Sequence, residues 1–218
     1  MFITAPYRRA HALEYADVWW DRRNPLFSDY SAIGGDCTNF VSQCLFAGCC
    51  RMNFKKDVGW YYRSDADRSP SWTGVEFLYR FLLGNPDVGP YGEEVGLSSA
   101  ELGDIIQLGR RDGTFYHSLL LTGYSKDGPL VTAHTNDVKN RPLSAYSFDA
   151  FRVIHIKWIR LETDSPDACF RQVLAGESTD AGTGGNDTGE ITVSEEERKT
   201  LQLEPEMAPG EGFAEPVG

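Results

Sequence analysis

Cys37 is the residue in this sequence best placed to act as a nucleophile. It follows Gly34, Gly35 and Asp36, and the two glycines permit a tight turn while Asp36 is a good helix N-cap. Apolar residues then recur with helical spacing, which predicts a helix beginning at Cys37 or one residue either side. A helix N-terminus carries partial positive charge and favours a thiolate over a thiol.

A nucleophilic cysteine needs a nearby base, and the sequence contains four histidines, at positions 11, 117, 134 and 155. His117 lies in an apolar, aromatic run that predicts a buried strand, joined through residues 110–113 to an earlier strand at 104–108. His134 lies in a third predicted strand at 130–137. Cys37, His117 and His134 could therefore supply nucleophile, base and orienting group, with Asn136 or Asp137 as alternatives for the third role.

These residues resemble the bacterial putative amidase domain family of papain-like cysteine hydrolases, near the NlpC-type and CHAP-type cell-wall amidases. The resemblance runs in order from Tyr7 to Trp158. The segments that carry it are Gly34–Cys44, the helix from Tyr7 to Trp20, Gly59–Tyr62, and the hairpin from Gly103–Gln107 to His117–Ser118.

The resemblance implies Cys37 as nucleophile, His117 as base and a polar third residue on the following strand, where this chain offers His134. Papain uses a glutamine upstream of its cysteine in the oxyanion hole, and no glutamine precedes Cys37 here. NlpC-type enzymes use a tyrosine, for which Tyr30 is the nearest candidate, beside the backbone N–H of Cys37. Gly59 and the aromatic residues Trp60, Tyr61 and Tyr62 lead into a loop, and these rings are candidates for the wall of a substrate cleft.

The elements that must position these residues form an α+β pattern, with helices first and an antiparallel sheet afterwards. Helices are predicted at 7–21 and 72–83, and a closing strand at 153–161. This order matches the papain-like fold that the resemblance implies, with N-terminal helices packed on a central sheet.

The chain divides by composition into a domain, 1–162, and an acidic Gly/Pro/Glu-rich tail, 163–218, for which we expect disorder. The tail holds 13 acidic residues against 3 basic ones, so the domain carries only −1 of the net charge of −11. The apolar cluster at 168–174 is the one part of the tail that could dock as a short helix. We expect no nucleic-acid partner, because the pI of 4.8 comes with no basic cluster.

Neither a signal peptide nor an apolar run long enough to span a membrane is found in the sequence, which favours a cytoplasmic protein. Removal of a leader would instead leave an extracellular or cell-wall enzyme. Five cysteines, an odd number, argue against a disulfide framework, and Cys44, Cys49, Cys50 and Cys169 are expected to be small buried hydrophobes. Metal-ligand spacing is missing, so no zinc or other cofactor is expected.

The sequence therefore predicts a cysteine hydrolase that cleaves an amide bond through an acyl-thioester on Cys37. Its substrate would be an amide or peptide, such as a cell-wall stem peptide, and a monomer is the default assembly. A transferase using an amine in place of water is a variant of the same chemistry. The alternative is a non-catalytic peptide- or cell-wall-binding module on the same fold.

Overall fold

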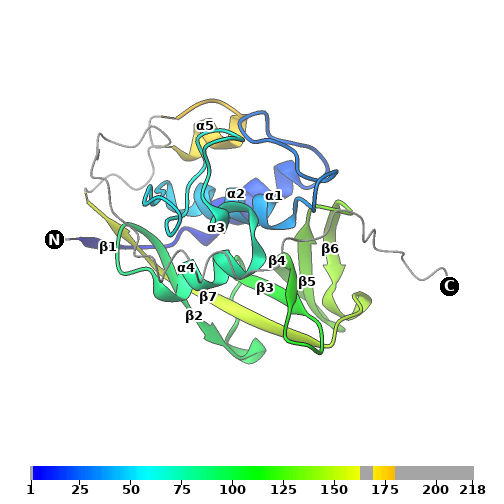
Figure 1. Ribbon diagram of the computed structural model, residues 1–218. Helices are drawn as coiled ribbons and strands as arrows, with labels where there is room; N and C mark the ends of the chain where they lie inside the picture. Colours follow the sequence, from blue (N-terminus) through cyan, green and yellow to red (C-terminus); the bar gives the residue numbers. More distant parts are fainter. Residues whose placement is uncertain (1, 163–168, 180–218) are drawn as a thin grey trace.

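The computed structural model describes residues 2–162 and 169–179, which form an α+β fold with a curled antiparallel sheet (Figure 1). Its helices are α1 (Arg9–Trp19), α2 (Cys37–Cys49), α3 (Pro70–Thr73), α4 (Val75–Gly84) and α5 (Phe170–Ala175). Its strands are β1 (Ile3–Pro6), β2 (Gly89–Val95), β3 (Ile105–Gly109), β4 (Phe115–Ser125), β5 (Gly128–Ala133), β6 (Val138–Pro142) and β7 (Ala150–Leu161).

The sheet is organised around β7, its longest strand. The strand order is β1-β7-β3-β4-β5-β6, and β2 also pairs with β7. β7 is long enough, at 12 residues, to pair with β3 through its first half and with β1 through its last residues. The predicted hairpin is confirmed, because β3 and β4 pair through the turn at residues 110–114.

The two faces of the sheet support separate apolar clusters. Alternation along β3 sends Ile105 toward the helices, while Ile106 and Leu108 pack on the opposite face. The helix-side cluster is the larger and includes side chains from α2, a helix whose 13 residues are all buried. Figure 1 shows the helices gathered over one side of the sheet, with α2 at the centre of that layer.

The aromatic segment Trp60–Tyr62, which the sequence offers as a candidate cleft wall, packs largely within this core. Trp60 is fully buried, and its indole N–H donates to Ser42 Oγ at 3.1 Å. Its ring packs against Trp72, with ring centroids 4.9 Å apart. Tyr61 and Tyr62 are each only 7% exposed. The backbone of the same segment forms an antiparallel bridge between Trp60 and Asn53.

Helix α5 extends the folded region beyond the boundary expected at residue 162. Val173 of α5 is fully buried, and its carbonyl accepts a hydrogen bond from Asn24. The Trp19 indole N–H donates to the Leu174 carbonyl at 3.0 Å. The predicted docking of this apolar cluster is therefore confirmed, while the expected disorder of 163–168 and 180–218 concerns residues outside those described.

A disulfide joins Cys50, which ends α2, to Cys169, which precedes α5. The expectation that both are free buried thiols is therefore wrong. The odd count of five gave no hint of the pair, because 119 residues separate its members and spacing alone cannot show which cysteines meet in space. Cys37, Cys44 and Cys49 remain free and buried.

These contacts make α5 part of the stable unit. We expect a chain ending at Thr179 to unfold in urea at the midpoint of the full chain, because residues 180–218 have a composition that cannot form a core. A chain ending at Glu162 loses both α5 and the cross-link, and should be less stable by about 3–5 kcal/mol. The double variant Cys50→Ala with Cys169→Ala separates the two effects. Equal midpoints for the chains ending at 162 and 179 would contradict this assignment.

Candidate active site

Cys37 is the first residue of α2, as the sequence predicts. Gly34 and Gly35 have φ values of 118° and 107°, a backbone region that residues with a Cβ rarely adopt, and they turn the chain directly into the helix. The Cys37 side chain is 7% exposed and lies at the end of the helix where the backbone N–H groups lack helical acceptors. The nucleophile candidate is therefore held by regular structure and close to the surface.

The base candidate, His117, lies on β4, the strand across which α2 packs. Burial alone would raise the pKa of the Cys37 thiol, but the charge of His117 and its hydrogen bond to the sulfur outweigh burial. Smaller contributions come from the Ser118 backbone N–H and the Thr38 hydroxyl, and the net effect lowers the pKa of Cys37. The structure thus brings together the two residues that the sequence assigns to nucleophile and base.

A β-bulge sets the position of His117 on its strand. Leu108 pairs with His117 while the next residue, Gly109, pairs with Phe115, so Tyr116 is an extra residue on β4. The ring of Tyr146 lies against the His117 ring, with centroids 5.9 Å apart. The bulge and this ring contact fix the imidazole at the start of the strand.

Asp36, immediately before Cys37, is a fully buried carboxylate with several donors. Its Oδ1 accepts hydrogen bonds from the Tyr30 backbone N–H at 3.0 Å and from Asn39 Nδ2 at 2.8 Å. Its Oδ2 lies 2.6 Å from His134 Nδ1 and 3.3 Å from Arg23 Nε. The side chain therefore makes no helix-capping hydrogen bond to the backbone of α2, although Asp36 occupies the N-cap position.

His134 is bound to Asp36 and does not orient His117 in this structure. Its Nε2 lies 2.8 Å from the backbone carbonyl of Trp19, which can only accept, so Nε2 carries a hydrogen. The other ring nitrogen faces the Asp36 carboxyl group, which accepts hydrogen bonds from two further groups and lies beside Arg23. Both ring nitrogens of His134 are therefore engaged away from His117, and its ring stacks on Phe40 at 4.0 Å between centroids.

The other predicted orienting residues follow His134 in the turn after β5, which ends at Ala133 and not at residue 137. Asp137 is bound to Arg23, at 2.9 Å, and Asn136 is exposed. The Tyr30 hydroxyl, the oxyanion candidate, donates to Asp65 Oδ1 at 2.8 Å, and this contact raises the pKa of Tyr30 after the larger effect of burial.

The sequence interpretation missed Asp36 as an organising residue and Thr135 altogether. Thr135 Oγ1 accepts the backbone N–H of Asp36 at 3.1 Å, so the β5–β6 turn binds the turn that precedes the nucleophile. The sequence did contain a signal for the role of Asp36, which lies between a glycine pair and a helix expected to be buried. A carboxylate buried there without partners would destabilise the folded state.

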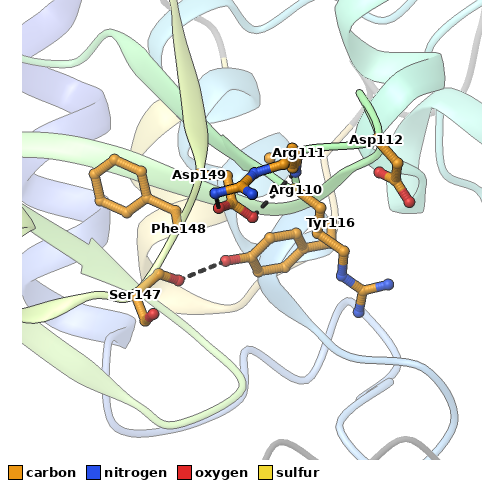
Figure 2. A pocket seen from close by; sticks show the side chains of 8 residues that line it. Arg110, Arg111, Asp112, Tyr116, Ser147, Phe148 and Asp149 are labelled. Carbon is orange, nitrogen blue, oxygen red and sulfur yellow. Dashed lines mark hydrogen bonds and ion pairs between the residues drawn. The ribbon is translucent and has the colours of Figure 1, made fainter.

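An open depression of about 500 Å³ lies where the β3–β4 turn meets the loop before β7 (Figure 2). Its wall combines charged and aromatic side chains and is formed by Gly109, Arg110, Arg111, Asp112, Tyr116, Ser147, Phe148 and Asp149. Figure 2 shows the Tyr116 hydroxyl reaching the Ser147 carbonyl, at 2.9 Å, and Arg111 beside Asp149. Tyr116 and Ser147 are the chain neighbours of His117 and Tyr146, so the depression adjoins the end of β4 that carries the base candidate, although neither Cys37 nor His117 lines it.

Within residues 2–162 and 169–179, no group of three or more His, Cys, Asp or Glu side chains could hold a metal ion. None of the helices in the same ranges has the length and apolar character needed to cross a membrane.

Comparison with known proteins identifies the family of the chain. Residues 6–156 match the putative amidase domain, a stretch that includes Cys37, His117 and His134. The chain belongs to this family. A member of the putative amidase domain family is expected to be a hydrolase, and the α+β fold described above positions a cysteine and a histidine that suit one.

The chain is also similar to the uncharacterized protein YhbB of Bacillus subtilis (strain 168). The two are 36% identical over 141 residues, which is 62% of this chain and 43% of the relative. The chain therefore spans less than half the length of that relative. No solved structure matches the chain.

The lowered pKa of Cys37 predicts selective alkylation. Near pH 7, iodoacetamide should modify Cys37 well before Cys44 or Cys49, because burial raises the pKa of Cys44 and raises that of Cys49 to about 12. His117→Ala removes the main influence that lowers the pKa of Cys37, so the pH midpoint of Cys37 alkylation should move upward. Peptide mapping after limited labelling measures both effects, and preferential modification of Cys44 or Cys49 would contradict them.

His134→Ala should behave differently from His117→Ala. Removing the partner of a buried carboxylate costs about 3–5 kcal/mol, so the His134 variant should unfold at clearly lower urea concentration. It should also raise the pKa of Cys37, since the Asp36 carboxylate next to Cys37 loses its nearest partner. His117→Ala serves as the matched control that affects the thiol and leaves the unfolding midpoint nearly unchanged. An unaltered midpoint in His134→Ala would exclude the buried pair.

Proposed function

We propose that this domain hydrolyses an amide bond with Cys37 as nucleophile and His117 as general base and acid. The observation that carries the proposal is the thiol with a lowered pKa at the start of a buried helix, beside a histidine on the adjacent strand. Membership of the putative amidase domain family supports the reaction class.

The proposed reaction has two steps. The Cys37 thiolate attacks the carbonyl carbon, and the His117 imidazolium gives its proton to the departing amine as the C–N bond breaks, leaving an acyl-thioester. His117 then takes a proton from water, whose oxygen attacks the thioester and releases the carboxylic acid and the Cys37 sulfur. An amine in place of water would make the same site a transferase.

The oxyanion of each tetrahedral intermediate needs a donor near Cys37. We assign the first donor to the backbone N–H of Cys37, at the positive end of α2. Tyr30 could add a second donor only by releasing Asp65, since its hydroxyl hydrogen is already given to that carboxylate.

The arrangement also supports a papain-like fold related to the NlpC-type and CHAP-type enzymes. Its nucleophile begins a buried helix, and its base lies on an antiparallel strand packed against that helix. His134 would then match the third position of the family pattern in sequence, although in the structure it contacts Asp36. Tyr146, whose ring contacts that of His117, would orient the base instead.

We further propose that the substrate is peptide-like and polar, as a cell-wall stem peptide is. Two arginines and two aspartates line the depression beside His117, which suits a substrate carrying charged groups of both signs rather than an acyl chain. The Cys50–Cys169 disulfide favours an oxidising compartment, consistent with a target outside the cytoplasm.

Turnover should be measured on muropeptides and on a panel of small amides, with mass detection of products. Cys37→Ala and His117→Ala should each abolish cleavage, and the double variant should be no worse than either, because the two residues act as a unit. Cys44→Ala is the matched control, a buried cysteine outside the site, and should keep full activity. Cleavage that survives in Cys37→Ala would exclude the mechanism, and stoichiometric binding without cleavage would favour a binding module.

A further inference from the structure

Arg152 is a buried cation whose surroundings satisfy its charge and its donors. Its guanidinium lies between the rings of Tyr79 and Phe115, 3.4 Å and 3.8 Å from their centroids, and the residue is 8% exposed. Its NH2 group donates to Glu76 Oε2 at 2.7 Å, and its Nε donates to Gln107 Oε1 at 2.8 Å. Because a guanidinium can only donate, it fixes which end of the Gln107 amide faces it.

The opposite end of that amide faces the active site. Gln107 Nε2 donates to the Val75 carbonyl at 2.8 Å and to Ser118 Oγ at 3.2 Å. Ser118 is fully buried and follows His117 on β4. Its hydroxyl therefore accepts from Gln107 and keeps one hydrogen to give.

The acceptor for that hydrogen is Thr38, the second residue of α2. Ser118 Oγ and Thr38 Oγ1 are 3.0 Å apart, and Thr38 Oγ1 lies 3.8 Å from Cys37 Sγ. If Thr38 donated to Ser118 instead, the Ser118 hydrogen would lack an acceptor among these groups. A thiolate can only accept, so the direction that satisfies every hydrogen runs from Ser118 to Thr38 and from Thr38 to the sulfur.

We propose that Arg152 and Gln107 are positioning residues which, through Ser118, hold the Thr38 hydroxyl with its hydrogen directed at the Cys37 thiolate. The inference deepens the proposed function and rests on it, because it concerns the same nucleophile. The Thr38 hydroxyl thereby stabilises the Cys37 thiolate, and the sheet residues Gln107 and Ser118 hold that hydroxyl in place. This contribution is independent of His117. The Thr38 hydroxyl is among the groups that lower the pKa of Cys37.

We call the hydrogen bonds from Gln107 through Ser118 and Thr38 to Cys37 the relay. The pH dependence of Cys37 alkylation by iodoacetamide tests it without any substrate. Thr38→Val removes the hydroxyl and keeps the branched shape, and should raise the midpoint by about 1 pH unit, the value of a hydrogen bond to a charged group. Thr38→Ser keeps the hydroxyl and should restore the original midpoint. An unchanged midpoint in Thr38→Val would overturn the proposal.

Gln107→Glu tests whether Arg152 and Gln107 set the direction of the hydrogen bond between Ser118 and Thr38. A glutamate can still accept from Arg152 but must also accept from Ser118, so the Thr38 hydrogen would turn to Ser118 and away from the sulfur. Thr38→Val should then cause no further shift in the Gln107→Glu background. If Thr38→Val shifted the alkylation midpoint equally in the wild-type and Gln107→Glu backgrounds, Gln107 would not set the direction of this hydrogen bond. That result would overturn the relay.

Ser118→Ala gives a second test, which does not require the Gln107→Glu variant to fold. The proposed direction predicts a small upward shift of the midpoint, because Thr38 loses the donor that polarises it. The reverse direction predicts a downward shift, because Thr38 would be freed to donate to the sulfur. These alkylation measurements need no substrate, so they remain valid if no amide is cleaved in the activity assay. If Cys37→Ala abolished cleavage but Thr38→Val left the alkylation midpoint unchanged, the relay would be rejected and the proposed function would stand.

Discussion

The buried carboxylate of Asp36 is the constraint on which the geometry of the candidate site depends. A charge with no exposure to water must be surrounded by donors, and here they come from the loop before α2, from α2 itself and from the β5–β6 turn. Satisfying it requires these segments to meet at one point. Cys37 is the next residue, so its place is fixed by the same requirement.

The sheet supplies the second half of the site with comparable rigidity. His117 lies on β4, where it pairs with Leu108 of β3, and β5 joins the other side of the strand from Leu120 onward. The bulge at Tyr116 sets the direction of the His117 side chain. Nucleophile and base therefore stand on regular elements and need little reordering to meet a substrate. Between them, hydroxyl groups of Thr38 and Ser118 continue the polar contact that joins α2 to the sheet.

Local signals predicted the parts of the fold that depend on local interactions. The glycine turn and helical spacing located the start of α2, and the alternation around residues 104–122 located the β3–β4 hairpin. The short strands β1 and β2 escaped prediction, because their residues become strands only by pairing with β7, far along the chain. Trp60 could not be placed by sequence for the same reason, since its burial depends on Trp72 and Phe81.

The candidate site divides in the same way. Chemistry limited the base to four histidines, and the strand pattern selected His117. His134 was expected to serve His117 because it lies in the strand predicted to follow, where the resemblance implies a polar third residue. The strand in fact ends at Ala133, and the turn that follows carries the imidazole toward Asp36. Turn geometry and ion pairing between distant residues leave no periodic trace in a sequence.

The disulfide at the end of α2 gives the molecule two kinds of sulfur on one helix. Cys37 is a free thiol, whereas Cys50, at the other end of the same 13-residue helix, is oxidised. Reductants and oxidants must therefore discriminate between sulfurs about 20 Å apart. Burial supplies the discrimination kinetically, since Cys50 and Cys169 are at most 1% exposed while Cys37 touches solvent. A mild thiol should therefore reduce an oxidised Cys37 while the Cys50–Cys169 cross-link survives.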